Sequence, residues 1–237
     1  MSKAKIVEKK SQNSVKYERE LLSKIRHPFI VNMIFCFQDR ENLYLVMDML
    51  TGGDLRYHVS RNKRFSEEQT KFFVACILLA LDYLHINNIL HRDIKPENLV
   101  LDEKGNYPYK ILNLPILYII DTYYLLIIGY VRLTDFGIAK LFQKENSSET
   151  SGTPGYMAPE VMCAQNHTIA VDYFALGVMT YEFMMGKVIS HIYIKRPYLG
   201  KTRKEIKEHI MSKQVQVTKN DIFEGWTLEA GDFINKV

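Results

Sequence analysis

Four polar side chains of types that can do chemistry lie in the middle of the chain, at Asp93, Lys95, Asn98 and Asp135. Magnesium takes hard oxygen ligands, often a carboxylate beside phosphate oxygens. Asp135 offers a carboxylate and Asn98 an amide oxygen, so both are candidate magnesium ligands. The four residues belong to the runs His91-Arg92-Asp93-Ile94-Lys95-Pro96-Glu97-Asn98 and Asp135-Phe136-Gly137.

The order of these motifs resembles that of the eukaryotic protein kinases, almost from Met1 to Val237. The first run reads as the kinase catalytic loop. Asp135-Phe136-Gly137 and Ala158-Pro159-Glu160 follow it in the order that the family has. The alternative, a polar loop that spells these letters by chance, does not account for three motifs in sequence.

The resemblance implies transfer of the γ-phosphate of ATP to a protein hydroxyl, with ATP and Mg²⁺ as cofactors. Asp93 would accept the proton of the attacking hydroxyl, and Asn98 and Asp135 would hold magnesium against the phosphates. Lys95 would lie close to the transferred phosphate, and Thr153 would orient Asp93 and Lys95. Lys95 and the run Pro96-Glu97-Asn98 favour serine/threonine over tyrosine specificity.

The fold class that follows is α+β, a kinase-like fold in two lobes. With 237 residues, the chain has the size of one large domain or two small ones. Residues 1–50 would form a truncated small lobe of a helix, two strands and a hinge. Residues 51–237 would form a mainly helical large lobe, incomplete at its C-terminus. A typical kinase domain is longer, so the chain is expected to be truncated at both ends.

Residues 11–26 have the spacing of an amphipathic helix, and Glu18 falls on its apolar stripe. An unpaired charge there is costly, so a cation should meet Glu18. In kinases a strand lysine does so. The family spacing places that lysine before Met1, as it does the glycine-rich phosphate loop, and Lys3 and Lys5 are too close in sequence to replace it. The resemblance therefore implies an incomplete fragment that is weakly active or inactive.

Residues 29–37 and 43–48 read as a hairpin of two strands. By resemblance, Met47 is the gatekeeper of the nucleotide site, Asp48 and Leu50 lie in the hinge that meets adenine, and Val100 lies under the adenine. Asp54 matches an acidic position that meets the ribose or a substrate arginine. Asp54 also suits a helix N-cap, and both roles can hold.

Several further residues receive structural or regulatory roles from the resemblance. Glu149 stands where many relatives carry a phosphorylated threonine, and its carboxylate could mimic the phosphate by pairing with Arg92. An exposed acid in a mobile loop explains Glu149 as well, and Ser147, Ser148 and Thr150 are candidate phosphosites. Asp172 would bond to the backbone of the catalytic loop. Leu22, Met33, His91 and Phe136 would form a hydrophobic spine, Gly137 completes its motif, and Glu160 would lack its usual arginine partner.

The runs His27-Pro28-Phe29-Ile30-Val31, Gly52-Gly53-Asp54-Leu55 and Gly152-Thr153-Pro154 look most like the cyclic-nucleotide-dependent and related basophilic kinases. In that group, acids matching Asp54, Glu97 and Glu182 receive arginines upstream of the target serine or threonine. The resemblance therefore implies a protein substrate with a basic motif.

Two helices of the large lobe can be read directly. Ser66-Glu67-Glu68-Gln69 fits a capping box, and the helix it opens carries Phe73, Ile77, Leu81 and Leu84 at helical spacing. Residues 168–185 are mostly apolar, which is typical of a helix buried on all sides.

Two segments interrupt the expected order. Leu99-Val100-Leu101 and Tyr130-Val131-Arg132-Leu133 would form a hairpin, but residues 106–129, rich in Ile, Leu and Tyr, stand between them. An insert at a surface turn explains this stretch better than a membrane span, since it holds Asp121, Pro108 and Pro115. Residues 188–195 form a smaller interruption. Our hypothesis is that both are translated introns.

The composition of the chain limits which partners and which cellular location are expected. A net charge of +4 is mild, and Lys3, Lys5, Lys9 and Lys10 fit a solvated helix face better than a nucleic-acid site. Cys36, Cys76 and Cys163 lack metal spacing, which favours free thiols in a reducing compartment. No secretory segment follows Met1, so an intracellular, cytoplasmic location is expected. The oligomeric state is not indicated. Rival functions are a pseudokinase-like interaction scaffold and a membrane-tethered regulator.

Overall fold

A computed structural model describes residues 1–62, 64–102, 129–186, 196–212 and 215–237. The predicted insert at 106–129, except Gly129, and the one at 188–195 lie outside these residues, so the intron hypothesis stays a prediction.

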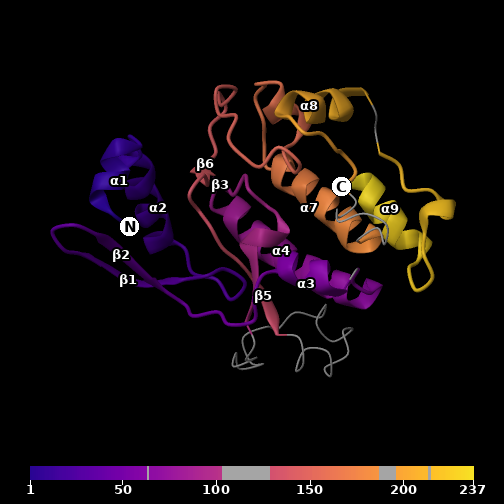
Figure 1. Cartoon of the computed structure of the whole chain (residues 1–237), viewed down its shortest axis with the longest axis horizontal. Helices are drawn as coiled ribbons and strands as arrows, with labels where there is room; N and C mark the ends of the chain where they lie inside the picture. Colours follow the sequence, from indigo (N-terminus) through magenta and orange to yellow (C-terminus); the bar gives the residue numbers. More distant parts are fainter. Residues whose placement is uncertain (63, 103–128, 187–195, 213–214) are drawn as a thin grey trace.

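The N-terminal part of the chain forms a small unit of two helices and a hairpin. α1 (Lys3–Glu8) and α2 (Gln12–Lys24) lie beside the antiparallel strands β1 (Met33–Gln38) and β2 (Leu43–Met47). In Figure 1 these elements form one side of the molecule, and the remaining helices form the other. The amphipathic helix predicted at residues 11–26 is confirmed, and its apolar stripe buries Leu22 and Ile25.

The first predicted strand begins later than expected, at Met33 instead of residue 29. The preceding residues bond to the large lobe instead. The N–H of Val31 donates to the carbonyl of Leu133 at 3.0 Å, and the N–H of Leu133 donates to the carbonyl of Phe29 at 2.8 Å. The Asn32 amide then bonds to the Ile30 carbonyl, which turns the chain before β1 begins. The hairpin is thus anchored to the other lobe by the segment that leads into it.

α3 (Leu55–Asn62) and α4 (Glu67–Ile86) open the large lobe. The predicted capping box of α4 is confirmed, because the Ser66 hydroxyl accepts from the Gln69 N–H at 3.2 Å while the Gln69 side chain accepts from the Ser66 N–H at 3.0 Å. By length and composition α4 could cross a membrane, but half of the relevant window is buried inside the protein, as in a core helix. The predicted apolar face is at most 1% exposed: Phe73, Ile77, Leu81 and Leu84.

α7 (Ala170–Met185) lies at the centre of the large lobe and packs against α4 and against α9 (Leu228–Lys236) (Figure 1). It is buried on nearly all sides, as its uniformly apolar sequence predicts. α6 (Pro159–Met162) packs against α8 (Arg203–Ser212) at the edge of this unit, and η3 (Lys219–Asp221) is a short turn before α9.

The strands of the large lobe are short antiparallel pairs that frame a loop. β3 (Ile89–Leu90) pairs with β6 (Lys140–Leu141), and β4 (Leu99–Asp102) pairs with β5 (Tyr130–Leu133). The hairpin predicted across residues 106–129 is therefore confirmed, with Leu99 opposite Leu133 and Asp102 opposite Tyr130. The turn η1 (Pro96–Asn98) leads into β4, so the chain between β3 and η1 is held at both ends.

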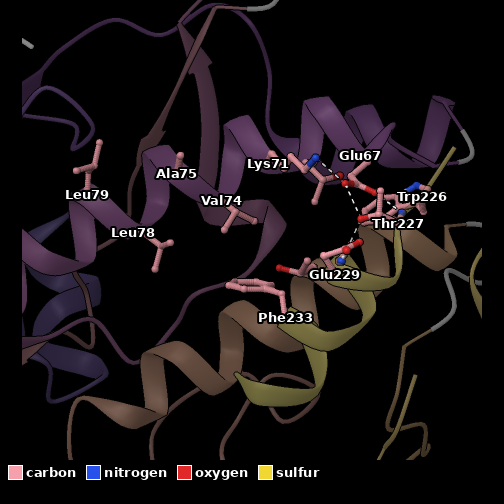
Figure 2. Close-up of a pocket in the computed structure, with 13 residues that line it drawn as sticks. Glu67, Lys71, Val74, Ala75, Leu78, Leu79, Trp226, Thr227, Glu229 and Phe233 are labelled. Carbon is pink, nitrogen blue, oxygen red and sulfur yellow. Dashed lines mark hydrogen bonds and ion pairs between the residues drawn. The ribbon is translucent and has the colours of Figure 1, made fainter. Parts of the chain in front are cut away.

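A groove of about 570 Å³ runs between α4 and α9. Figure 2 shows its apolar walls, with Val74 and Phe233 facing the space, and a polar cluster at one end. There the buried Glu67 carboxylate accepts from the Thr227 N–H at 2.5 Å and pairs with Lys71 at 2.6 Å, which ties the start of α9 to α4. None of the lining residues belongs to the catalytic-loop motifs.

Candidate active site

The loop between β3 and η1 is held by Asp172, which lies in the first turn of α7. The Asp172 carboxylate accepts from the backbone N–H of His91 at 3.0 Å and of Arg92 at 2.7 Å. Its Oδ2 also lies 2.9 Å from His85 Nε2. Asp172 is fully buried, so these partners compensate for the loss of water around its charge. Arg92 takes a left-handed φ of 67°, a conformation that the loop must hold against strain.

Asp93 is the centre of a short polar network. Its Oδ2 pairs with Lys95 Nζ at 2.5 Å, and its Oδ1 accepts from the Thr153 hydroxyl at 2.6 Å. Lys95 Nζ also donates to Thr153 at 2.9 Å, so the three side chains bond to one another. Burial alone would raise the pKa of Asp93, but Lys95 and Thr153 hold that pKa below its ordinary value. Asp93 is therefore ionised at neutral pH and can accept a hydrogen bond from an alcohol.

Asn98 links this network to the strand that precedes Asp135. The Asn98 amide nitrogen donates to both the carbonyl and the carboxylate of Asp93, each at 3.0 Å. Its backbone carbonyl accepts from the Thr134 N–H at 2.9 Å, one residue before Asp135. Asn98 therefore bonds to Asp93 through its side chain and to Thr134, the neighbour of Asp135, through its backbone.

The residues present fit a magnesium ion. Because the Asn98 nitrogen faces Asp93, its side-chain oxygen faces away and can serve as a ligand. Asp135 is exposed, takes a φ of 64° and uses Oδ1 to accept from the Gly137 N–H at 3.1 Å, so Oδ2 stays free for a metal. Among the described residues no group of three His, Cys, Asp or Glu could hold a metal. One carboxylate and one amide oxygen suit magnesium, which takes further ligands from phosphates and water.

A cavity of about 270 Å³ lies between the lobes and adjoins Asp135. It collects side chains that the sequence assigns to a nucleotide site, although they are far apart in the chain. Asp54 is not among its lining residues; it caps α3 by accepting from the Tyr57 N–H at 2.7 Å, the alternative role weighed for it. The predicted residues that do line the cavity are Met47, Asp48, Leu50, Val100, Glu18, Leu22, Asp135 and Phe136.

Glu18 faces this cavity without an ion-pair partner among the residues that the structure describes. Burial raises the pKa of its carboxyl, and the nearby Asp135 charge raises that pKa further. Lys3 lies elsewhere, with its ammonium bonded to the Asp39 carbonyl at 2.6 Å. The cation expected opposite Glu18 is thus not supplied by the described part of the chain.

His91 packs instead of titrating. Its ring meets Phe136 edge-on, with 5.1 Å between ring centroids, and both residues are buried. His91 Nε2 lies 3.1 Å from the Thr134 carbonyl and its Nδ1 lies 3.3 Å from the Asp93 N–H, which assigns the proton to Nε2. Burial lowers the pKa of His91, so its imidazole is neutral. Leu22 is buried and Met33 packs half-buried on the same core.

Residues 138–157, the activation segment that the resemblance implies, are tied to the catalytic loop by Glu149 as well as by Thr153. Glu149 Oε2 accepts from Arg92 Nη1 at 2.6 Å, and Lys140 pairs with its other oxygen. Arg92 also donates to the Ile138 carbonyl through Nε at 2.8 Å. Glu149 is therefore a paired, partly buried residue. Glu160 lies in the first turn of α6, after Pro159, and makes no ion pair within the described residues.

Two of the acids assigned to substrate binding already face arginines. Glu97 pairs with Arg56 at 2.9 Å, and the fully buried Glu182 pairs with Arg56 at 3.0 Å and with Arg196 at 2.8 Å. The Tyr156 hydroxyl donates to Glu182 at 2.6 Å. Burial and the Glu182 charge raise the pKa of Tyr156, which keeps its hydroxyl protonated.

Sequence reasoning missed several of these partners. Val31 and Thr134 line the cavity that adjoins Asp135, and Lys140 shares Glu149 with Arg92. Arg132, in β5, is 3% exposed and bridges Asp48 at 2.7 Å and Asp102 at 2.8 Å. An arginine within a strand of otherwise apolar character was the available signal, because a buried cation needs acids nearby. No comparable signal marked Arg56 or Arg196.

The whole chain, residues 1–237, matches the family model described as the protein kinase domain. A "probable serine/threonine-protein kinase" of Dictyostelium discoideum is 38% identical over 221 residues, which cover 92% of this chain and 41% of that protein. The human serine/threonine-protein kinase Sgk1 is 34% identical over 223 residues, covering 93% of this chain and 44% of that protein. The cAMP-dependent protein kinase catalytic subunit of D. discoideum is 36% identical over 186 residues, covering 78% and 25%.

The chain therefore belongs to the protein kinase family, and its relatives are of the serine/threonine type. The predicted two-lobed α+β fold and the resemblance to the cyclic-nucleotide-dependent and related kinases are confirmed. The chain spans less than half the length of these curated relatives.

Proposed function

We propose that this chain is a serine/threonine kinase domain that transfers the γ-phosphate of ATP to the hydroxyl of a protein substrate. The observation that carries the proposal is the Asp93 carboxylate, held by Lys95 and Thr153 and linked through Asn98 to the strand before Asp135. Positioning and charge stabilisation supply most of the catalysis in phosphoryl transfer, so a fixed carboxylate and a fixed cation are the parts required.

Each residue has a stated task in this proposal. Asp93 accepts the hydrogen bond of the substrate hydroxyl and aligns it for attack. Lys95 lies beside Asp93 and stabilises charge on the transferred phosphate. The cavity lined by Met47, Leu50 and Val100 holds the adenine. Asn98 and Asp135 would hold magnesium, which neutralises charge on the phosphate oxygens when it is bound.

The level of activity depends on the cation that the resemblance places opposite Glu18, where it would contact the phosphates of ATP. With no cation opposite it in the described chain, the phosphates lack one preorganised electrostatic contact. Loss of one such contact costs about 3–4 kcal/mol of transition-state stabilisation. We therefore expect turnover in the 237-residue chain to be slow. A chain that binds ATP without any transfer would instead be a pseudokinase-like scaffold.

The substrate proposal keeps a basic residue upstream of the target serine or threonine. Of the three acids assigned to it, Asp54 makes no ion pair within the described residues and uses only one carboxylate oxygen in capping α3. Asp54 is therefore the acid left to read a substrate arginine.

For location we propose the cytoplasm, because the three cysteines are free thiols in the structure and the proposed reaction consumes ATP. We assign no nucleic-acid partner to the chain, and membrane attachment is not part of the proposal.

The test is transfer of labelled γ-phosphate to a serine-containing protein substrate in the presence of Mg²⁺. Wild-type chain should give slow, metal-dependent labelling, and Asp93→Asn should abolish it. Nucleotide binding is followed in parallel by the thermal shift caused by Mg-ATP. The proposal fails if the Asp93→Asn variant labels substrate as fast as wild type, since no other carboxylate is assigned its task.

A further inference from the structure

We infer that Arg56 occupies, from within the chain, the acidic site formed by Glu97 and Glu182, and that it thereby removes selection for a substrate arginine at that site. The inference rests on the proposed function, which makes the substrate a protein with a serine or threonine. The role given to Arg56 rests on the contacts that its side chain makes from α3.

Arg56 is held in place by its own helix. It lies in the first turn of α3, whose start is capped by Asp54. From there its Nε reaches Glu97 Oε1 at 2.9 Å, in the turn η1 just before Asn98. Its Nη2 reaches Glu182 Oε2 at 3.0 Å, and the side chain is only 17% exposed. One planar guanidinium therefore spans two carboxylates in a fixed fork, a geometry that lysine cannot reproduce.

A second arginine, Arg196, neutralises the remaining negative charge of Glu97 and Glu182. Arg196 Nε donates to Glu182 Oε1 at 2.8 Å, and its guanidinium lies over the Tyr156 ring, 5.2 Å from the centroid. Two carboxylates thus face two guanidinium groups. An incoming substrate arginine would meet no net negative charge here, and it would have to displace a cation that is already bonded on both sides.

The three acids assigned to substrate arginines therefore divide into two kinds. Asp54 keeps a carboxylate oxygen free of ion pairs in the described chain, whereas Glu97 and Glu182 are engaged. The site would select a basic substrate residue at the position that faces Asp54. At the position that faces Glu97 it would bind a neutral residue equally well. Arg56 is on this view a specificity-determining residue.

The test measures peptide binding, which does not require turnover. Fluorescein-labelled peptides with one serine in an alanine background carry a single arginine at each upstream position in turn. Their dissociation constants are measured by fluorescence anisotropy with Mg²⁺ and a non-hydrolysable ATP analogue. In Arg56→Met, Glu97 loses its partner, and an arginine at one upstream position should gain about tenfold in affinity relative to alanine. Wild type should show less than twofold preference at that position.

Arg61→Met is the matched control, because Arg61 lies on the same helix, is exposed and bonds Tyr57 and neither acid. It should leave every ratio unchanged. Glu97→Gln is a second variant that keeps the buried Arg196–Glu182 pair, so it tests the inference even if the Arg56 variant does not fold. In wild type the Glu97→Gln change should not alter the preference for arginine at any position.

The inference is overturned if Glu97→Gln abolishes an arginine preference that wild type shows, or if folded Arg56→Met gains none. These outcomes are separate from failure of the proposed function. Peptide binding that follows the predicted ratios without phosphate transfer would refute the kinase proposal and leave the role of Arg56 standing.

Discussion

Arg92 in the catalytic loop donates a 2.6 Å hydrogen bond to Glu149 in the activation segment, 57 residues further along the chain. Both side chains are largely buried, at 8% and 16% exposed. Arg92 is also the residue that follows His91 and precedes Asp93, so the pair couples the activation segment directly to the catalytic loop. We propose that this carboxylate takes the place of a phosphate group, which would pair with an arginine in the same way.

Replacing Glu149 by Gln should loosen the activation segment. The change leaves the Arg92 charge mostly buried with only carbonyl partners, and breaking such a pair costs about 3 kcal/mol. We expect faster amide hydrogen exchange over residues 147–153 and a matching loss in the free energy of unfolding. Glu145→Gln is the control, because Glu145 is exposed and makes no ion pair in the described chain. Equal exchange in the two variants would show that the Arg92 pair does not order the segment.

Replacing Thr153 by Ala should slow phosphate transfer at least about tenfold, because Asp93 loses a hydrogen-bond donor and Lys95 loses an acceptor. The hydroxyl helps to hold the pKa of Asp93 below its ordinary value. Without it that pKa rises, so the acidic limb of the pH profile should move to higher pH. Thr153→Ser keeps the hydroxyl and should restore both the rate and the limb. A Ser variant as slow as the Ala variant would mean that only the methyl group matters.

The local elements and the catalytic motifs could be predicted from the sequence because their signals are local. The Ser66–Gln69 capping box and the stripe of α4 follow from spacing, and the strands on either side of residues 106–129 follow from the kinase resemblance. The motif that contains Asp93 and Asn98 spans eight residues, so its geometry is set mostly by its own loop and by Asp172.

Long-range pairings could not be predicted in the same way. Arg56 and Glu182 are 126 residues apart, and nothing in either local sequence marks them as partners. The sequence predicts too early a start for β1 because residues 29–31 are as apolar as a strand, yet their backbone bonds to Leu133. Which cation meets which acid is decided by how the helices pack.

Replacing Glu18 by Gln should stabilise the protein at neutral pH by about 1 kcal/mol, or roughly 3 °C in Tm. Burial, then Asp135, raises the pKa of Glu18 above its ordinary value of 4.5, so the folded state prefers the protonated carboxyl. The stability from this group is present below pH 4.5 and is lost as pH rises through the folded pKa. The free energies of unfolding of the variant and of wild type should therefore be similar in acid and should differ increasingly as the pH rises through the pKa of Glu18 in the folded state.

Urea unfolding of both proteins at several pH values checks this sign. Glu20→Gln is the control on the same helix, since Glu20 is exposed and pairs with Lys24 at 2.8 Å. It should destabilise slightly at neutral pH, opposite to Glu18→Gln. A Glu18→Gln variant that is less stable than wild type at pH 7 would mean that a cation meets Glu18 in solution.

Replacing Arg132 by Met should destabilise the protein by about 3–5 kcal/mol, because it leaves the Asp48 and Asp102 carboxylates without the buried cation that bridges them. Asp48 lies in the segment proposed as the hinge, so we also expect faster amide exchange at residues 47–50 and weaker binding of Mg-ATP, with no change in α7. Arg40→Met, in the exposed turn between β1 and β2, is the control and should alter neither quantity. If Arg132→Met loses less than about 1 kcal/mol, the two acids are stabilised by other groups, and the hinge is held by its backbone alone.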